Sequence, residues 1–355
     1  MRPCSHRPLL LALALASCTR LDFAPQPFPP PGSEPFEGFG SGTRGGSGGR
    51  VITIAEASEA AVQSAFADAV ATGDAVIRFA VTEPITITGT LPKLTAPGVT
   101  IEGGGATLDA RASRHDVALI DIRTRDVIVR DLRLRNGYDN LRVSGPESFN
   151  VVIAHVSSTG ARDDGISIGY GAHDVTVQYA FLAGNTRSVF CKYGGTTRIS
   201  LHHSWMQKGW ARSPLFSGAG MIDVRNVIVE DWGEWGSRLE DGASGNVIGG
   251  LFALSPYARA RGAKPDGALR LLGTGPVFTA DNVFRGEARP APPGDATAPL
   301  PAPPVRTLGP DVMEGLVRAR AGCLPRDRVD AAYVALHDGW RVTAEVPLQL
   351  AGTPE

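Results

Sequence analysis

The chain has few aromatic residues and almost no net charge. Each of these features excludes some folds or binding partners. Aromatic side chains make up 7% of the 355 residues, while Gly (43) and Pro (27) are abundant. This balance favours many turns and short strands over a helical bundle. The 35 basic and 36 acidic residues leave a net charge of −1. The overall charge therefore favours neither nucleic acid nor an acidic membrane surface as a partner.

Cysteine is also scarce, with four residues in the whole chain. Only Cys191 and Cys323 lie in the body of the sequence, far from the N-terminus. Outside the cytoplasm the two could form a disulfide. Two isolated cysteines are more often unpaired and buried, so the sequence leaves both possibilities open.

The apolar run at the N-terminus is too short to span a bilayer. Arg2 and Arg7 precede it, and it ends in Leu15-Ala16-Ser17-Cys18, which resembles a bacterial lipobox. We expect residues 1–18 to be a lipoprotein signal peptide with Cys18 as the lipidated first residue. The alternative is an ordinary signal peptide cut nearby. Either predicts an exported protein, in the periplasm, at the outer membrane or cell surface, or secreted. In the lipobox interpretation the lipid anchor is the only expected membrane contact.

A short run of alternating apolar residues returns at a fixed interval in the middle of the chain. Four such runs share a 24-residue period, marked by Val127, Val151, Val175 and Ile199. Two further runs, MIDVRNVIVED and GNVIGGLF, follow at nearly the same interval. β-Branched residues, period-two alternation and flanking Gly, Asn or Asp are typical of strands. A fixed period with no helix between the strands predicts a parallel β-solenoid, in which residues one period apart stack on the same face.

The segments before the periodic strands differ in composition. Residues 19–36 are rich in Pro and Phe and are expected to be a linker. Residues 37–50, EGFGSGTRGGSGGR, are dense in glycine, but they lack the preceding strand and the Gly-Lys-Ser/Thr ending of a phosphate-binding loop. Residues 55–72 form the one clear helical pattern, which would cap the open edge of the first coil.

The remaining boundaries follow from the same composition. Strands are expected at 75–80, 84–88 and 98–101, before the periodic coils, which continue to about residue 285. Residues 288–305 are rich in Pro and Ala and indicate a loop, while residues 307–346 are expected to pack back on the solenoid. We assign residues 37–350 to a single domain and expect a monomer.

The period also identifies residues that stack into a candidate site. Asp139, Asp163 and Arg187 share one phase of the 24-residue period, and Arg212 follows one position late. Stacked carboxylates could hold a hard cation such as Ca²⁺. Stacked guanidinium groups could bind a carboxylate. The column therefore predicts a groove for a polyanionic chain, the alternative being a row of surface ion pairs between coils.

A second column runs through Asp131, His155, Tyr179 and His203, which are related by the same period. These residues fall at strand ends, where polar ladders often belong to turns. His202 precedes His203, and adjacent strand residues point to opposite faces. We therefore expect a structural use of the two histidines rather than one shared site.

Asp163 and Asp164 have a second interpretation as a general acid and base for glycoside hydrolysis. A hydrolase on a β-solenoid would resemble the polygalacturonases. That family carries further Gly-His-Gly and Arg-x-Lys elements, and neither follows Asp164 in this sequence. The sequence therefore favours another chemistry.

Residues 199–232, ISLHHSWMQKGWARSPLFSGAGMIDVRNVIVEDW, carry a more specific resemblance. A strand ending in His-His, an Arg-x-Pro element and a Val-Arg-Asn strand leading to Trp-Gly resemble the pectate lyases of polysaccharide lyase family 1. The segments EGFGSGTRGGSGGRVITI, NVVIAHVS, DVTVQYAFL and GCLPRDRVDAAYV are similar to other parts of that family. The likeness spans roughly residues 36–340.

The resemblance implies an all-β fold, a right-handed single-stranded parallel β-helix with a short N-terminal capping helix. It implies β-elimination on polygalacturonate, an acidic polysaccharide, with Ca²⁺ bridging enzyme and substrate and an arginine taking the C5 proton. By motif, Arg212 is the catalytic arginine, and Arg187 and Pro214 bind substrate. Asp139 and Asp163 match Ca²⁺ ligands, with Asp164 as a further candidate.

Three positions depart from the family's pattern. Ser167 stands where a further acidic Ca²⁺ ligand is expected, and Ser217 where a second arginine often follows Arg-x-Pro. Arg187 replaces a lysine, which keeps the charge but changes its geometry. A Ca²⁺-independent mode like that of pectin lyases, with Arg187 supplying positive charge, and a non-catalytic uronate-binding protein therefore stay open as alternatives.

Overall fold

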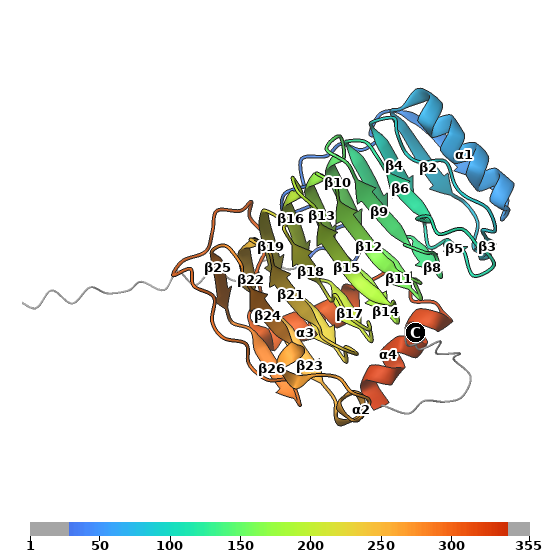
Figure 1. The fold of residues 1–355 in the computed structure, drawn as a ribbon. Helices are drawn as coiled ribbons and strands as arrows, with labels where there is room; N and C mark the ends of the chain where they lie inside the picture. Colours follow the sequence, from blue (N-terminus) through green and yellow to red (C-terminus); the bar gives the residue numbers. More distant parts are fainter. Residues whose placement is uncertain (1–27, 340–355) are drawn as a thin grey trace, which may run out of the picture. The chain divides into compact units, whose positions relative to one another are not determined.

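The computed structural model describes residues 28–339, and the body of the chain is a solenoid of three parallel sheets (Figure 1). The compact unit that contains the sheets begins at Pro35, close to the predicted boundary between linker and domain. The predicted signal peptide with Cys18 and residues 340–350 lie outside the described residues. The predicted all-β solenoid is confirmed. Within residues 28–339, no helix has the length and apolar character needed to cross a membrane.

Each central coil contributes one strand to each sheet, while the first coils lack some of these strands, and all neighbouring strands are parallel. Sheet A contains β1 (Arg50–Ile54), β2 (Ala75–Phe79), β4 (Val99–Glu102), β7 (Val127–Arg130), β10 (Phe149–Ala154), β13 (His173–Gln178), β16 (Thr197–His202), β19 (Met221–Arg225), β22 (Ser244–Ile248) and β25 (Val277–Ala280). Sheet B contains β3 (Ile85–Thr86), β5 (Thr107–Asp109), β8 (Arg133–Arg135), β11 (Ser157–Thr159), β14 (Phe181–Ala183), β17 (Trp205–Gln207), β20 (Ile228–Glu230), β23 (Leu251–Leu254) and β26 (Val283–Gly286). Sheet C contains β6 (Ile120–Ile122), β9 (Leu141–Ser144), β12 (Asp164–Gly169), β15 (Arg187–Lys192), β18 (Leu215–Ser217), β21 (Ser237–Glu240) and β24 (Leu269–Leu272).

The predicted 24-residue period is the register of sheet A. Val127, Val151, Val175 and Ile199 are successive partners across β7, β10, β13 and β16. These side chains are at most 1% exposed and stack along the inside of the solenoid. The period shortens by one residue at the next coil, where Ile199 pairs with Ile222. The apolar core is therefore a set of ladders parallel to the solenoid axis.

The second predicted column forms the corner between sheets A and B, as the turn interpretation required. Asp131, His155, Tyr179 and His203 all have positive φ, between 49° and 54°. The rings of His155 and Tyr179 stack with centroids 5.0 Å apart, and Tyr179 stacks on His203 at the same distance. A left-handed residue at each corner turns the chain from one sheet into the next at a fixed position.

The first coil is capped by helix α1 (Glu59–Thr72), inside the predicted span of 55–72. The helix begins four residues later than predicted because Ser58 is its N-cap, with Oγ accepting the Ala61 N–H. Val62 and Phe66 are fully buried beneath it. The first strands, β2, β3 and β4, lie at or close to their predicted positions.

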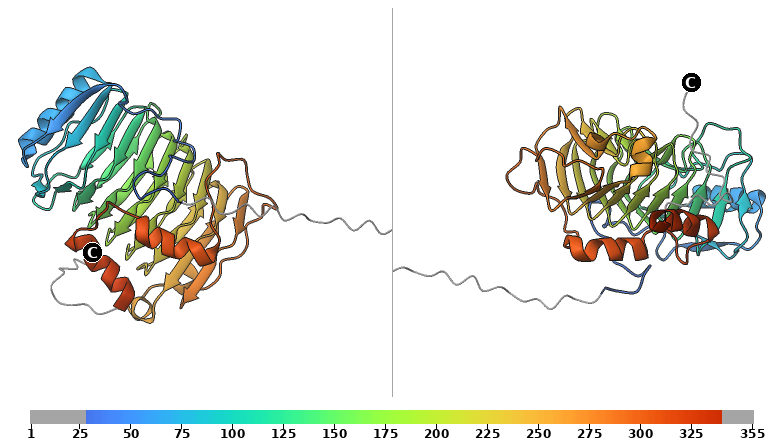
Figure 2. Two further views of the ribbon diagram at one scale, coloured as in Figure 1. Left: turned by 180° about the vertical axis from the view of Figure 1, so that it is seen from behind. Right: turned by 90° about the horizontal axis from the view of Figure 1, so that it is seen from below.

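The glycine-dense segment is a strap that lies along the outer face of sheet A (Figure 2). The Phe39 N–H donates to Ser200 Oγ, and the Gly40 N–H donates to Thr176 Oγ1. A Cβ on Gly40 would lie 2.3 Å from the carbonyl oxygen of Val151, so only glycine allows this close approach. Close packing against the sheet is the physical reason for the glycine content of residues 37–50, which the sequence pattern did not reveal.

The predicted C-terminal packing is confirmed for the described residues. Helices α3 (Pro310–Arg320) and α4 (Arg328–Gly339) lie along the outside of sheet B (Figure 2). They form one apolar cluster with the sheet, which contains Phe181, Ala183, Trp205, Ile228, Leu251, Met313, Val317, Ala321, Tyr333 and Leu336. Short helices α2 (Pro256–Ala260) and η1 (Pro265–Gly267) lie in a loop between β23 and β24, and residues 288–305 form no helix or strand. Cys191 and Cys323 are buried and unpaired.

A buried charge network fixes α4 to sheet B. Asp330 is fully buried, and its carboxylate lies 2.9 Å from Arg135 Nη2 and 3.8 Å from Arg133 Nε. Ser157 Oγ donates to the same carboxylate at 2.6 Å. Two buried guanidinium groups would lose a counter-ion if this side chain were removed.

We therefore expect Asp330→Ala to lower the free energy of unfolding by up to about 3–5 kcal/mol. The variant removes the fully buried counter-ion and leaves both arginines only Asp327, whose side chain is partly exposed. Glu314→Ala is the matched control, since it breaks the more exposed pairs of α3 with Arg285 and Arg318. The Glu314→Ala substitution should lower the free energy of unfolding by less than about 1 kcal/mol. Urea unfolding followed by circular dichroism measures both, and equal losses would contradict the prediction.

Candidate active site

The predicted column of charged residues lies at the beginning of the sheet C strands. Asp139 precedes β9 by two residues, Asp164 and Arg187 are the first residues of β12 and β15, and Arg212 lies three residues before β18. Parallel strands begin at the same edge of a sheet, so these side chains share one edge. The structure therefore brings together residues that come from four successive coils of the sequence.

The register at this edge differs from the strict 24-residue step. Leu141 pairs with Ile166, a step one longer than the period, and Ile166 pairs with Val189, a step one shorter. Asp164, rather than Asp163, is consequently the register partner of Arg187. The extra residue before β12 is offset by one residue fewer before β15, which a constant period could not reveal. Asp163 lies one position upstream, and its side chain still forms an ion pair with Arg187.

The three predicted carboxylates form a cluster, with one oxygen from each of Asp139, Asp163 and Asp164 within 4.8 Å of the others. Asp139 and Asp164 are 1% and 3% exposed. Burial, reinforced by the nearby Asp139 charge, raises the pKa of Asp164 to about 7, although Arg212 and Arg142 oppose this shift. Asp164 Oδ1 is buried and accepts no hydrogen bond from the described residues.

Each carboxylate has an arginine beside it. Arg187 pairs with Asp163, and Arg212 Nη1 lies 3.6 Å from Asp164 Oδ1. Arg142 donates to Asp139 Oδ2 from Nε at 2.9 Å and from Nη2 at 2.5 Å. Three carboxylates therefore face three guanidinium groups. The ion-pair alternative and the binding-site prediction describe the same side chains.

Arg142 is the residue that the sequence reasoning missed. Its register partner on the next coil is Ser167, the position where the family resemblance implies an acid. A guanidinium group thus stands beside the place of the absent carboxylate. The spacing in the sequence could have identified it. Arg142 precedes Ser167 by the same number of residues that separates Asp139 from Asp164.

The two other arginines lie close to each other. Burial lowers the pKa of Arg187, and the charge of Arg212 lowers it further. Arg212 has a φ of 57°, and its guanidinium group lies over the Phe190 ring, 4.2 Å from the centroid. Phe190 belongs to an apolar cluster on sheet C with Ala211, Leu215 and Trp235. Arg212 is thus held by an aromatic face and one carboxylate.

Two other residues of the Arg-x-Pro region are buried. Pro214 is buried, and its carbonyl accepts the Arg238 N–H at 2.8 Å. Ser217 Oγ donates to Asp241 at 2.7 Å. Any contribution of Pro214 to substrate binding would act through the shape of the Arg212 loop, and its predicted role remains a prediction.

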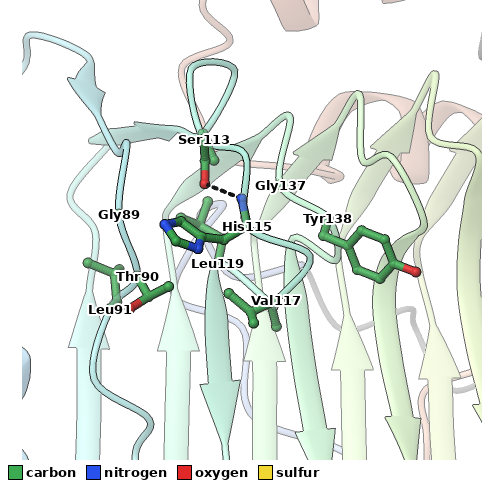
Figure 3. A pocket seen from close by; sticks show the side chains of 11 residues that line it. Gly89, Thr90, Leu91, Ser113, His115, Val117, Leu119, Gly137 and Tyr138 are labelled. Atoms are coloured by element: carbon green, nitrogen blue, oxygen red, sulfur yellow. Dashed lines mark hydrogen bonds between the residues drawn. The ribbon is translucent and has the colours of Figure 1, made fainter.

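A pocket on the preceding coils adjoins the column at Tyr138, the neighbour of Asp139 in sequence (Figure 3). Thr90, Leu91, His115 and Val117 also line it, and the His115 N–H donates to Ser113 Oγ. None of the described residues that line it carries a carboxylate, guanidinium or ammonium group. The cluster of acids and arginines, rather than this pocket, is therefore the candidate site.

The two histidines do not join this site, because His202 ends β16 in sheet A. The expectation that they point apart is wrong, since their Nδ1 atoms lie 2.9 Å from each other. The positive φ of His203 takes this residue out of the strand and turns its ring toward His202.

Oxygen ligands at this spacing fit a hard cation such as Ca²⁺. The buried Asp164 oxygen, which has no hydrogen-bond donor among the described residues, and the raised Asp164 pKa both indicate negative charge that is incompletely neutralised. Arg142 competes at one of the three carboxylates. The residues present therefore fit the ion, with Asp164 as the ligand least engaged by a neighbouring arginine.

No family model matches the chain. The probable pectate lyase C of Emericella nidulans is 28% identical over 263 residues, which cover 70% of this chain and 58% of the relative. The probable pectate lyase C of Aspergillus terreus is 27% identical over 237 residues, which cover 62% of this chain and 54% of the relative. The chain therefore spans little more than half the length of these curated relatives.

Two solved structures share the fold. Pectate lyase II from Xanthomonas campestris pv. campestris has a TM-score of 0.57 and 16% identity, covering 81% of this chain and 98% of that one. A Bacillus sp. N165 pectate lyase, solved in complex with trigalacturonate, has a TM-score of 0.61 and 15% identity, with the same coverage. Curated relatives and solved neighbours alike are pectate lyases, which confirms the resemblance to the pectate lyase family that the motifs in residues 199–232 predict.

Proposed function

We propose that the protein is a polysaccharide lyase that cleaves polygalacturonate by β-elimination. The observation that carries the proposal is the cluster of three carboxylates and three arginines at the start of the sheet C strands. Such a site can bind a polyanion through guanidinium groups while holding a cation on its acids. The named relatives supply the class of reaction and substrate.

The reaction needs a base and a positive site for the uronate carboxylate. The base takes the proton from C5, and the electron pair of that bond forms the double bond between C4 and C5. The bond from C4 to the glycosidic oxygen breaks, and that oxygen takes a proton from the conjugate acid of the base or from water as it leaves. We assign the base to Arg212, which must act in its neutral guanidine form to accept the proton. The binding of a substrate carboxylate is assigned to Arg187, and Pro214 shapes the loop that carries Arg212.

Asp139, Asp163 and Asp164 would hold Ca²⁺, and Ser167 contributes no charge to that set. When bound, the ion would neutralise the substrate carboxylate and make the C5 proton more acidic. The chain's own part is to keep three acids, two of them buried, close together and to orient them. The Asp164 N–H, for example, donates to Asp139 Oδ1 at 3.1 Å.

A Ca²⁺-independent reaction is the second candidate, and Arg142 favours it. Its guanidinium group occupies Asp139 Oδ2 beside the uncharged Ser167, so it places a fixed positive charge among the acids. The uronate carboxylate would then meet Arg142 and Arg187 instead of a metal. A non-catalytic uronate-binding protein would instead bind oligogalacturonate and release no unsaturated product.

We further propose that the protein is exported and acts as a monomer on acidic polysaccharide. The N-terminal signal and Cys18 support export with a lipid anchor.

Replacing the proposed base tests the catalytic assignment. Arg212→Ala should lower the rate of unsaturated product formation from polygalacturonate by about 100- to 10,000-fold, the contribution typical of a positioned base. Ultraviolet absorbance of the 4,5-unsaturated product measures it. Arg198→Ala, which changes an exposed arginine on sheet A, should keep the wild-type rate. Full activity in the Arg212 variant would reject the assignment.

Arg142 decides between the metal-assisted and metal-independent modes. If its charge replaces Ca²⁺, wild-type activity should survive chelation, and Arg142→Ala should lose about 10- to 100-fold in chelator, as expected for a charge-assisted contact. Added Ca²⁺ should restore that variant. Arg123→Ala removes the partner of Asp121 on the preceding coil and serves as control. Wild-type activity abolished by chelator would instead favour the metal-assisted mode.

The raised Asp164 pKa predicts how Ca²⁺ binding varies with pH. Below a pKa of about 7 the folded apoprotein keeps Asp164 protonated, so a bound cation must displace that proton. The Ca²⁺ affinity should therefore fall by up to about tenfold per pH unit as the pH drops below 7, and level off above it. Calorimetric titrations at several pH values measure this. Asp164→Asn should bind more weakly and without that pH dependence; an unchanged pH profile would count against the assignment.

A further inference from the structure

A second cluster of metal-ligating side chains lies on sheet A, away from the residues proposed for catalysis. Glu37, His202 and His203 each place one ligand atom within 4.8 Å of the other two. Both histidines are fully buried, and Glu37 is half-buried. Nothing in the proposed lyase reaction uses these residues, so the inference is independent of it.

The histidine pair is incompletely satisfied as it stands. A contact of 2.9 Å between two Nδ1 atoms requires that one nitrogen carries a proton and the other accepts it. The two Nε2 atoms are buried without a hydrogen-bond partner among the described residues. Two neutral imidazoles therefore share a single proton between their Nδ1 atoms, and a cation at that place could be bound by the lone pairs of both.

The strap brings the third side chain to this pair and holds it there. The Glu37 N–H donates to Gln178 Oε1 at 3.1 Å, and the Glu37 carbonyl accepts from Thr176 Oγ1 at 2.9 Å. Glu37 Oε2 accepts the Arg306 N–H at 3.0 Å, which orients the carboxylate. Carboxylates that bind metals are commonly fixed by such a second hydrogen bond.

We propose that Glu37, His202 and His203 form a binding site for a divalent transition-metal ion such as Zn²⁺. Two imidazoles and a carboxylate suit zinc, whereas Ca²⁺ takes oxygen ligands. Two nitrogens bound to one tetrahedral zinc lie about 3.3 Å apart, given Zn–N distances of about 2.0–2.1 Å. The observed separation of 2.9 Å is therefore close to the bound geometry. The ion would replace the proton that the two nitrogens share.

The charges around the site both help and oppose an ion. Burial lowers the pKa of His202 to about 4 and that of His203 well below its usual value, so both rings are neutral at pH 7 and only the shared Nδ1 proton competes with an ion. Arg225 faces His202, and Arg306 and Arg320 face His203. The Glu37 carboxylate offsets part of this positive charge. We therefore assign a structural role, in which the ion ties the strap and the segment at Arg306 to the end of β16.

The test uses the full chain, freed of metal by chelation and titrated with Zn²⁺ or Co²⁺ alone. We expect Zn²⁺ to bind and to raise the melting temperature, and bound Co²⁺ to show the visible absorption of a four-coordinate site. Glu37→Gln should weaken Zn²⁺ binding at least tenfold and remove the increase in melting temperature. This substitution lies in the half-buried strap and leaves both histidines in place, so folding should be preserved.

Two control variants separate this site from others. His173→Gln changes a partly exposed histidine of sheet A that pairs with Asp174, and Asp139→Asn changes the lyase cluster. Both should bind Zn²⁺ as the wild type does. Absence of Zn²⁺ binding in the wild type, or full binding by Glu37→Gln, would overturn the proposal. Loss of binding in Asp139→Asn alone would also overturn it, because the ion would then belong to the other cluster.

Discussion

The backbone register between successive coils is the constraint on which the rest of the structure depends. Each strand hydrogen-bonds to the coil before it and the coil after it, so a side chain's position along the sheet edge follows from its place in the coil. Left-handed corner residues such as Tyr179 and His203 set where each sheet ends. The core ladders, the ring stack at the corner and the charged cluster on sheet C all follow from that alignment.

The charged cluster illustrates how a solenoid can tolerate buried acids. Three carboxylates from two coils lie within a few ångströms. Burial, and after it the charge of Asp139, raises the pKa of Asp164. Arg142, Arg187 and Arg212 compensate from three coils, each beside a different carboxylate. The number of opposite charges is balanced, yet Asp164 Oδ1 still lacks a hydrogen-bond donor among the described residues. Stability and ligand binding thus draw on the same side chains.

The sequence could predict what depends on period alone. It located the periodic strands of sheet A, the corner residues and four members of the charged cluster, because these recur with the 24-residue period or one residue from it. The four are Asp139, Asp163, Arg187 and Arg212. It could not predict that the step from β9 to β12 is one residue longer than the period and the step from β12 to β15 one residue shorter. The two changes in turn length cancel, so the interval from β9 to β15 is still two full periods. Because of that shift, Asp164 rather than Asp163 is the strand register partner of Arg187. The role of Arg142, the path of the glycine-rich strap and the contact between His202 and His203 depend on side-chain direction, which alternation rules describe only inside a strand.

The strap also has a consequence for the order in which the chain can fold. Its hydrogen bonds join Glu37 to Gln178, 141 residues away, and to Arg306, 269 residues away. Closing such long loops is slow, because the intervening chain must first be organised. During synthesis the strap is made long before β13 and β16, the strands that it binds. The solenoid must therefore assemble several coils before its own N-terminal segment can dock, so that docking is a late event that closes the outer face of sheet A.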